Sequence, residues 1–400
     1  MDKQNDRTIL HCDMNGFYAS VELLDYPQYK NVPMAVCGDP KSRHGIILAK
    51  NEPAKKYGIK TAETIWQAKK KYPQLVLIPP HREKYEKYSK LINEIYLRYT
   101  DMVEPFSIDE SWLDVTASLN LFGSEKEMAD EIRKTVKKEL GLTLSAGVSF
   151  NKFFAKMGSE YKKPDATTVI SRENFKDIIW TMDISEMFFV GKSTSEKLNK
   201  IGIHSIGDLA ACQKNVLISL LGKQGSILYD YANGLDNDPV ALYSQREKIK
   251  SIGHGTTFTR NLVGDEDIKT ALSVLCDKVA TRLRKHKMRA YGVKVDIKDP
   301  DFNVVSKQRQ VPIAINTSEE LKEIAFDIIK SFWQDSKPIR LLTITAINLV
   351  DENEDQQLSL FDTGGIEKRE KAESVERTID SIRNKYGTSA IKFGRTVNKK

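Results

Sequence analysis

The 400-residue sequence has few cysteines and no long apolar run. Its four cysteines lie far apart and form no CxxC pair: Cys12, Cys37, Cys212 and Cys276. This pattern excludes a disulfide-rich secreted scaffold and a zinc ribbon. No segment approaches the roughly 18 consecutive apolar residues of a membrane span, and the first residues, MDKQNDRTILHCD, lack the pattern of a signal peptide. We therefore expect a cytoplasmic protein without a membrane partner.

The composition is that of a folded, mildly basic protein. Hydrophobic residues make up 40% of the chain and charged residues 29%, which excludes wholesale disorder. Lysine and arginine total 62 against 55 aspartate and glutamate, a formal net charge of +7. This excess weakly favours polyanionic partners. At about 150 residues per domain, the length predicts about three domains rather than one core.

The residue pattern predicts two α+β regions separated by short helices. Strand and helix patterns alternate over 9–170, with one hairpin over 103–115, an arrangement of the split βαβ type. Short helices punctuated by glycine follow over 172–235. A second α+β region comes next, with helices expected over 267–287 and 318–333.

Three carboxylates stand where strand patterns end. Asp13 follows a buried-looking strand, and Asp109 and Glu110 lie at the tip of the hairpin. A carboxylate in a buried position is costly unless something pairs with it, and a bound cation would do so. Hard oxygen ligands suit Mg²⁺, which takes few carboxylates and completes its shell with water and phosphate. An isolated Asp-Glu pair in a turn is more often simply solvated, and composition does not show that the two strands are neighbours.

Three sequence blocks carry a resemblance to a known family. DMNGFYASVE at 13–22 and SIDESWLDVT at 107–116 resemble the two carboxylate motifs of the Y-family (translesion) DNA polymerases. GVSFNKFFAKMGSEYKKPDATTVI at 147–170 resembles the palm segment of that family, and the likeness extends over roughly residues 7–350. The bacterial polymerase IV and polymerase V branches are the most similar.

The resemblance implies a multi-domain α+β right-hand polymerase with a ferredoxin-like palm and a helix-hairpin-helix thumb. The expected boundaries are palm 1–22 and 78–170, small fingers 23–77, thumb 171–242, linker 243–250, C-terminal α+β little finger 251–350 and flexible tail 351–400 with a helical patch near 373–385. The implied activity is low-fidelity, template-directed DNA synthesis opposite damaged template, by two-metal nucleotidyl transfer and without proofreading. The implied partners are primer–template DNA and deoxynucleoside triphosphates, and we expect a monomer.

The matching positions imply a catalytic metal site and a nucleotide site. Asp13, Asp109 and Glu110 correspond to the metal ligands of the family, with the backbone carbonyl of Met14 as a further contact, and two Mg²⁺ ions are implied. Tyr18 corresponds to the steric gate, a ring beneath the sugar that leaves no room for a ribose 2′-hydroxyl. The residues implied in nucleotide binding are Asn15, Gly16, Phe17, Tyr18, Lys55 and Lys163.

One block departs from the family pattern. Many polymerase IV members hold the triphosphate with a Tyr and an Arg three residues apart, whereas the aligned positions here are Glu52 and Lys55. Lys55 keeps the positive charge but loses the forked geometry of Arg. Glu52 brings a negative side chain near a polyanion. We therefore expect this segment to bind the triphosphate of the incoming nucleotide differently from the family pattern.

Glycine turns and a basic run predict DNA-binding surfaces. FVGKSTSEKLNKIGI at 189–203 resembles a helix-hairpin-helix element, whose turns present backbone N–H groups to phosphates without reading bases. From Lys278 to Lys298 there are eight Lys or Arg and one acid, Asp296, which is either a solvated helix face or a duplex-gripping surface. The expected DNA contacts are Gly191, Lys192, Gly202, Ser251, His254, Thr257, Arg282, Arg284, Lys285, Lys287 and Arg289.

The tail contains QLSLF, which matches the short peptide by which bacterial proteins bind the replication sliding clamp. Leu360 and Phe361 are implied to fill an apolar pocket, with Gln357 and Leu358 as further contacts. Exposed apolar residues in an acidic stretch need a partner. The alternative is a strand that adds back to the core.

Two other functions could use the same residues. The first is a non-catalytic clamp- and DNA-binding scaffold, in which Glu52 and Lys55 mark a lost nucleotide site; the intact carboxylates, Tyr18 and Lys163 argue against it. The second is a metal-dependent nuclease, which has no incoming nucleotide for Tyr18 to screen.

Leu360→Ala combined with Phe361→Ala should separate clamp binding from catalysis. Truncating an apolar anchor in a filled pocket typically costs more than about 1 kcal/mol. Basal primer extension should be unchanged, and the stimulation by added sliding clamp should be lost, with Asp362→Ala as the control. Equal stimulation of the wild type and the double variant would show that QLSLF is not the docking peptide, and loss of basal activity would show that it packs on the polymerase body.

Overall fold

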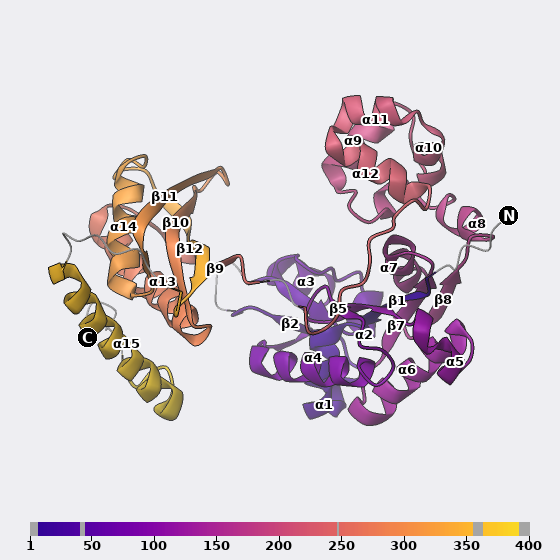
Figure 1. The fold of residues 1–400 in the computed structure, drawn as a ribbon, viewed down its shortest axis with the longest axis horizontal. Coiled ribbons are helices and arrows are strands. Elements are labelled where there is room, and N and C mark those ends of the chain that lie inside the picture. Colours follow the sequence, from indigo (N-terminus) through magenta and orange to yellow (C-terminus); the bar gives the residue numbers. More distant parts are fainter. Residues whose placement is uncertain (1–6, 41–44, 246–247, 355–362, 392–400) are drawn as a thin grey trace. The chain divides into compact units, whose positions relative to one another are not determined.

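The computed structural model describes residues 7–40, 45–245, 248–354 and 363–391. The chain forms two compact units, Met1–Arg246 and Glu247–Lys400 (Figure 1). Each unit combines sheets and helices, so the expected α+β class is confirmed. Within the described ranges, no helix is long and apolar enough to cross a membrane.

The first unit is built on a five-stranded sheet of order β5-β6-β1-β7-β8. Its strands are β1 (Ile9–Met14), β5 (Val103–Pro105), β6 (Glu110–Asp114), β7 (Leu144–Ser149) and β8 (Thr167–Ile170). β1 lies antiparallel between β6 and β7, and β8 runs parallel to β7. The second strand of the expected hairpin is therefore the direct neighbour of β1.

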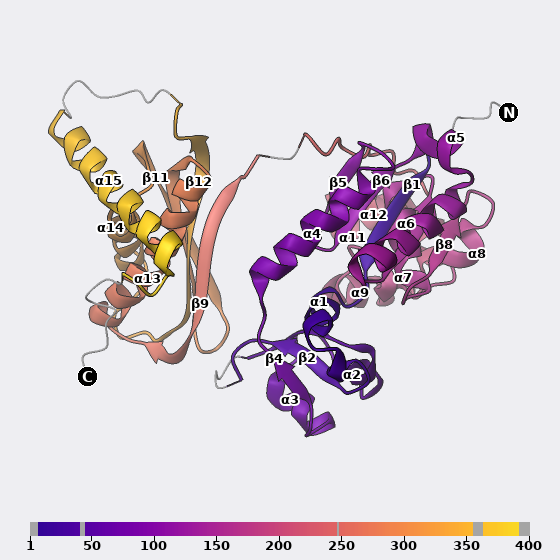
Figure 2. The ribbon, with the colours of Figure 1, turned by 90° about the horizontal axis from the view of Figure 1, so that it is seen from below.

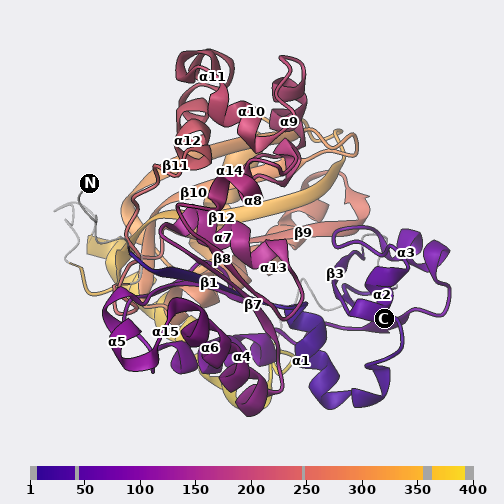
Figure 3. The same cartoon turned by 90° about the vertical axis from the view of Figure 1, so that its right-hand side faces the viewer.

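Helices cover both faces of this sheet (Figure 3). Leu10, Cys12 and Met14 of β1 share a buried cluster with α4 (Arg82–Tyr96) and α6 (Glu125–Leu140). The alternate residues of β1 face α7 (Lys152–Tyr161) on the other side, because successive side chains of a strand point to opposite faces. Gly147 permits the close approach of α7, since a Cβ there would lie 1.9 Å from the carbonyl oxygen of Ala155.

A second, three-stranded sheet of order β3-β2-β4 follows the first helix of the unit. Its elements and the adjoining helices are α1 (Phe17–Asp25), η1 (Pro27–Tyr29), β2 (Met34–Cys37), β3 (Ile47–Lys50), α2 (Glu52–Lys56), α3 (Ile65–Lys71) and β4 (Val76–Ile78). Short helices make up the rest of the unit: η2 (Thr116–Ser118), α5 (Leu119–Phe122), α8 (Phe175–Ile179), η3 (Ile184–Glu186), α9 (Lys192–Asn199), α10 (Ile206–Ala211), α11 (Lys214–Leu221) and α12 (Lys223–Ala232).

The second unit is a four-stranded antiparallel sheet of order β11-β10-β12-β9 with helices on one face (Figure 2). Its elements are β9 (Ser251–Leu262), α13 (Asp265–Lys285), β10 (Met288–Lys298), β11 (Val304–Ile315), α14 (Ser318–Lys330) and β12 (Ile339–Asp351). The two helices expected here are α13 and α14, and each ends a few residues earlier than the pattern predicts.

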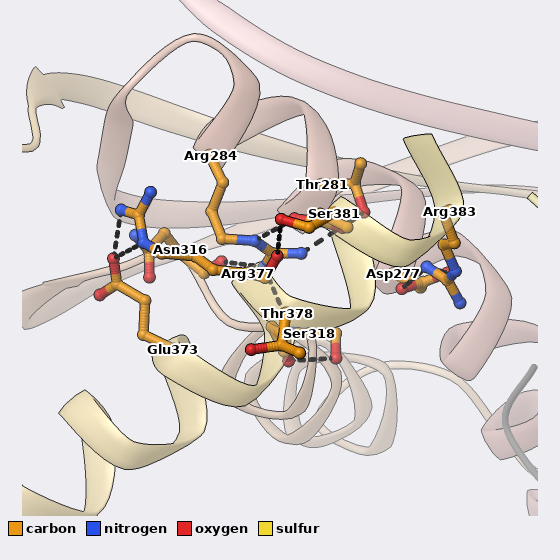
Figure 4. Close-up of polar contacts among 12 residues, drawn as sticks. Asp277, Thr281, Arg284, Asn316, Ser318, Glu373, Arg377, Thr378, Ser381 and Arg383 are labelled. Carbon is orange, nitrogen blue, oxygen red and sulfur yellow. Dashed lines mark hydrogen bonds and ion pairs between the residues drawn. The ribbon is translucent and has the colours of Figure 1, made fainter. Parts of the chain in front are cut away.

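The C-terminal segment differs from the flexible tail that the sequence suggested. Thr363–Tyr386 form α15, which is longer than the expected helical patch and packs against α13. Ion pairs fasten the helix to the unit. Arg383 binds Asp277 at 2.9 Å (Figure 4), and Arg377 binds Glu352 at 2.7 Å. Charged residues that look solvated in the sequence are thus used to dock a helix.

The expected DNA contact of Arg284 is wrong. Its side chain is only 3% exposed, and its guanidinium pairs with Glu376 and, at 2.7 Å, with Asp380 of α15 (Figure 4). Arg289 is also committed to this helix, since its Nη2 donates to Glu373 at 3.0 Å. A buried guanidinium needs acidic partners. The basic run by itself did not reveal them, because they lie far along the chain.

Glu376→Ala combined with Asp380→Ala should destabilise the second unit, because the Arg284 guanidinium would remain buried without its acids. Breaking a buried ion pair on one side costs roughly 3–5 kcal/mol. Hydrogen exchange of α13 peptides during a urea titration should show a lower midpoint. Asp335→Ala, which removes an exposed partner of Lys330, is the control and should change stability by less than about 1 kcal/mol. An unchanged α13 midpoint in the double variant would mean that α15 does not stabilise the unit.

Candidate functional site

Acidic residues from two strands and one helix meet at one end of the five-stranded sheet. The register sets Asp13 of β1 opposite Glu110 of β6, and Asp13 is only 4% exposed. The backbone N–H of Met14 donates to the carbonyl of Asp109 at 3.1 Å, which ties the hairpin turn to the end of β1. One carboxylate oxygen each of Asp13, Glu110 and Glu160 lies within 4.8 Å of the other two. We call these three carboxylates the acidic group.

Glu160 was not among the residues that the sequence suggested. It lies on α7, and the only signal was its position inside the third family-like block, three residues before Lys163. Asp109 lies beside the acidic group rather than in it, and its carboxylate accepts the hydroxyl of Ser107 at 2.7 Å. Burial and the nearby charge of Asp13 raise the pKa of Asp109, against the hydrogen bond from Ser107.

Two lysines neutralise the acidic group. Lys156 Nζ lies 3.0 Å from Asp13 Oδ2, 3.1 Å from Glu110 Oε1 and 3.0 Å from Glu160 Oε1. Lys163 Nζ lies 2.9 Å from Asp13 Oδ2 and 2.8 Å from Glu160 Oε1. Lys163 was expected at the triphosphate, whereas Lys156 was missed, because a lysine inside a helix of mixed polarity carries no special signal.

His11 lies behind the acidic group, on the face of β1 that meets α7. The Ser159 hydroxyl donates to the carbonyl of Lys156 at 2.8 Å, and its oxygen also lies 2.9 Å from His11 Nδ1, in a hydrogen bond whose donor depends on the tautomer of His11. His11 Nε2 faces Glu110 Oε2 at 3.6 Å. Burial lowers the pKa of His11. Burial alone would raise the pKa of Glu110, but the neighbouring His11 and the Lys156 ammonium outweigh it and lower that pKa to about 2.

An open pocket of about 390 Å³ lies over the acidic group. Its lining includes the acidic group, Asp109, Lys163 and the first turn of α1, and also Leu48, Lys50 and Thr61. Backbone N–H groups of a helix N-terminus attract phosphate, so the start of α1 suits a negatively charged ligand despite the nearby carboxylates. Carboxylates and phosphate share a site when divalent cations bridge them.

Lys55 is not among the residues that line this pocket. It pairs instead with Glu52 at 3.8 Å, and both side chains are 57% exposed. Lys50 does line the pocket, where its ammonium donates to Thr61 Oγ1 at 3.2 Å. Burial and the nearby charge of Lys55 lower the pKa of Lys50. Of these two lysines, the one that brings positive charge to the pocket therefore lies on β3 rather than on α2.

Tyr18 lines the pocket and is backed by a second ring. Its ring stacks on Tyr85 of α4 with centroids 4.0 Å apart and an angle of 11° between the planes. The Tyr85 hydroxyl donates to the buried carboxylate of Glu22, which fixes the backing ring. The sequence did not indicate this role of Tyr85, since a contact between two helices carries no short-range signal.

The other implied nucleotide residues lie at the same end of the sheet. Gly16 adopts a φ of +53° before α1, and Phe17 is buried, so these two residues offer backbone groups rather than side chains. Asn15 uses its side chain to brace the structure: Oδ1 accepts the N–H of Asp165 at 2.8 Å, and Nδ2 donates to Ser145 at 2.9 Å. It thereby holds the loop that carries Lys163.

The expected DNA contacts lie on separate elements. Gly191 precedes α9, which begins at Lys192, and Gly202 adopts a φ of +82° in the following turn. Ser251, His254 and Thr257 lie on β9, and Arg282 of α13 donates to the carbonyl of Gly253 on that strand at 2.7 Å. Lys285 and Lys287 follow at the end of α13. The implied clamp contacts Gln357, Leu358, Leu360 and Phe361 lie outside the described residues.

Comparison with known proteins gives the same reading of the fold. The impB/mucB/samB family model matches residues 12–160, and its C-terminal domain matches residues 249–360. Between them, the IMS family HHH motif matches residues 172–203, and the thumb-domain model of DNA polymerase-iota matches residues 189–236.

Relatives and a solved structure match over most of the chain. DNA polymerase IV of Acetivibrio thermocellus is 44% identical over 388 residues, 97% of each chain. DNA polymerase IV 1 of Bacillus subtilis is 35% identical over 397 residues, 98% of this chain and 94% of the relative. A chimeric Y-family DNA polymerase has a TM-score of 0.76 at 24% identity, covering 86% of this chain and 99% of that one.

The relatives, together with the acidic pocket at the end of the main sheet, define a DNA-directed DNA polymerase. The chain belongs to the impB/mucB/samB family, the Y-family translesion DNA polymerases. Both relatives described above are DNA polymerase IV enzymes, so the expected family, fold and enzyme class are confirmed.

Tyr18→Ala should increase ribonucleotide incorporation strongly and reduce deoxynucleotide addition less. The ring lines the pocket and cannot retreat, because Tyr85 stacks behind it. Single-nucleotide primer extension with matched ribo- and deoxynucleotides measures the ratio. Tyr18→Phe is the matched control and should leave the ratio near the wild-type value, because the ring remains. An unchanged ratio in Tyr18→Ala would mean that the ring only packs against Tyr85.

Proposed function

We propose that the pocket binds a deoxynucleoside triphosphate and that two Mg²⁺ ions bind at its acidic floor during primer extension opposite damaged template. The observation that supports this most is the convergence of Asp13 and Glu110 from adjacent strands in a pocket that Tyr18 also lines. The donors fit hard divalent cations, because they are carboxylate oxygens grouped within 4.8 Å. In this proposal Asp13, Asp109 and Glu110 hold the ions together with the carbonyl of Met14.

Such ions, when bound, stabilise the attacking and leaving oxygens of the in-line transfer. The residues of the chain orient the substrate around them. The N–H groups of Gly16, Phe17 and Tyr18 face the phosphates at the start of α1. Lys163 exchanges its carboxylate partners for a phosphate, and the Tyr18 ring excludes a 2′-hydroxyl. Lys50 takes the role that the sequence suggested for Lys55, because Lys50 is the lysine of this segment that lines the pocket.

Low fidelity and the absence of proofreading remain part of the proposal. The pocket is open, and the sheet that carries Leu48 and Lys50 is small, so the shape of the nascent base pair is only loosely enclosed. Weak shape selection tolerates a damaged template base and also a wrong nucleotide. Loose enclosure thus accounts for lesion tolerance and errors together.

We assign the DNA contacts to the regions that the sequence suggested as thumb (171–242) and little finger (251–350). The turns at Gly191 and Gly202, on either side of α9, offer backbone N–H groups to one strand without reading bases. The second unit contributes β9 and the remaining basic residues Arg282, Lys285 and Lys287. Arg284 and Arg289 are left out of this proposal because both pair with acids of α15. Clamp binding through 357–361, a monomeric state and a cytoplasmic location stay predictions.

One observation would fit the non-catalytic scaffold that the sequence left open. Glu52 and Lys55 pair with each other at the surface, so the family-type grip on the triphosphate is absent from that helix. Lys50, Lys163 and the start of α1 still provide positive groups at the pocket, which favours an active enzyme. Primer extension by the wild type on damaged and undamaged templates tests the proposed synthesis opposite damaged template.

Asp13→Ala or Glu110→Ala should abolish nucleotide addition and leave primer–template affinity within a few fold. Metal ligands act on the transition state, whereas other regions supply duplex binding. Primer extension in Mg²⁺ and a DNA-binding titration on the same samples measure both effects. Glu139→Ala, which breaks an exposed pair with Arg98 elsewhere in the unit, is the control and should extend normally. Near-normal extension by Asp13→Ala would contradict the proposal that Asp13 is a metal ligand.

A further inference from the structure

The acidic group contacts a lysine to which no role in the reaction has been assigned above. Lys156 projects from α7 between the three carboxylates of the acidic group, and its side chain is only 7% exposed. An ammonium has three N–H donors, and three carboxylates lie within 3.1 Å of this one. The hydrogen-bonding capacity of Lys156 is therefore matched to this cluster.

Carboxylates packed this closely repel one another, and their burial adds a desolvation cost. Asp13 is 4% exposed and Glu110 has a side chain that is 20% exposed, so water screens Asp13 little and Glu110 only in part. Removing one partner from a buried ion-pair cluster is strongly destabilising, because uncompensated charge remains inside. A cation beside these carboxylates offsets that cost and thereby favours the pairing of the end of β1 with the start of β6. In the structure that cation is Lys156, with Lys163 as a second, more exposed contributor.

We propose that Lys156 is a built-in cation that keeps the acidic group assembled before divalent metal binds. It is a positioning residue that acts through Asp13 and Glu110, and the inference rests on the proposed metal site. When metal binds, Asp13 and Glu110 turn to the metal, and Lys156 keeps Glu160, its neighbour one turn along the same helix. Lys156 and divalent metal are therefore alternative means of balancing the same negative charge.

A lysine one turn earlier on α7 provides a matched comparison. Lys152 Nζ pairs with Glu104 at 2.6 Å, and its side chain is 14% exposed. This pair is also part-buried and also joins α7 to the sheet, but Glu104 does not belong to the acidic group. Loss of Lys152 thus removes an ion pair without touching a proposed metal ligand.

Thermal unfolding of the full chain in EDTA and in millimolar Ca²⁺ or Mg²⁺, without DNA or nucleotide, tests the proposal. Lys156→Met should unfold at a much lower temperature than the wild type in EDTA, and metal should restore a large part of the loss. The gap in Tm between metal and EDTA should be several-fold wider than in the wild type, because bound metal stabilises the folded state by mass action. Lys156→Arg, which keeps the charge, should have a gap close to that of the wild type.

Lys152→Met should lower the Tm equally in both buffers. A gap of wild-type width in Lys156→Met would overturn the proposal, and so would a gap in Lys152→Met as wide as that in Lys156→Met. If Lys156→Met gives no folded protein in either buffer, Lys156→Gln takes its place. Failure of both variants to fold even with metal also overturns the proposal, because metal then cannot replace the ammonium.

A Mn²⁺ titration of the wild type separates this inference from the proposed function. If Mn²⁺ binds to the wild type and binding is lost in Asp13→Ala, the proposed metal site stands, whatever the Tm of Lys156→Met. If Mn²⁺ does not bind to the wild type with or without nucleotide, the proposed metal site itself fails, and the inference fails with it.

Discussion

The pocket depends on the antiparallel pairing of β1 with β6. In this register Asp13 lies opposite Glu110, and the backbone of Met14 is bonded to that of Asp109. A shift of one residue would turn the alternate side chains of β1 to the other face and would remove Asp13 from α7. The buried residues Leu10 and Cys12, which face α4 and α6, oppose such a shift because they would lose their core contacts. The hydrophobic pattern of one strand thus positions the chemistry.

The chain buries charge in both units and compensates it in the same way. In the first unit Asp13 is buried and Lys156 of α7 supplies the opposite charge. In the second unit Arg284 is buried and Glu376 and Asp380 of α15 supply it. In each case a helix distant in sequence brings the partner, so the ion pairs couple the docking of that helix to the stability of the unit. At the pocket, the cation that compensates the buried charge lies among the same carboxylates that are proposed to bind metal ions.

The lysines of the pocket lie at other positions than the family pattern suggests. Glu52 and Lys55 of α2 pair with each other at the surface, and the positive charge at the pocket comes from Lys50 and Lys163. A Y-family DNA polymerase needs cationic groups near the triphosphate, but their position along the chain is less restricted than that of the carboxylates. Carboxylates must match the geometry of a metal ion, whereas a flexible lysine acts as a point charge.

Short motifs and local periodicity were enough to predict the family and the α+β class. They also singled out the carboxylates at the strand ends and Tyr18 as candidate site residues. The sequence by itself also determined the existence of α13 and α14, whose apolar faces repeat at helical spacing. The tertiary structure alone decided that Glu160 and Lys156 join Asp13, that Tyr85 backs Tyr18 and that Arg284 serves α15 rather than DNA. These features are contacts between elements far apart in the chain. A charged or aromatic residue looks the same in sequence whether it meets solvent, a ligand or a distant helix, and only the packing of the elements distinguishes these cases.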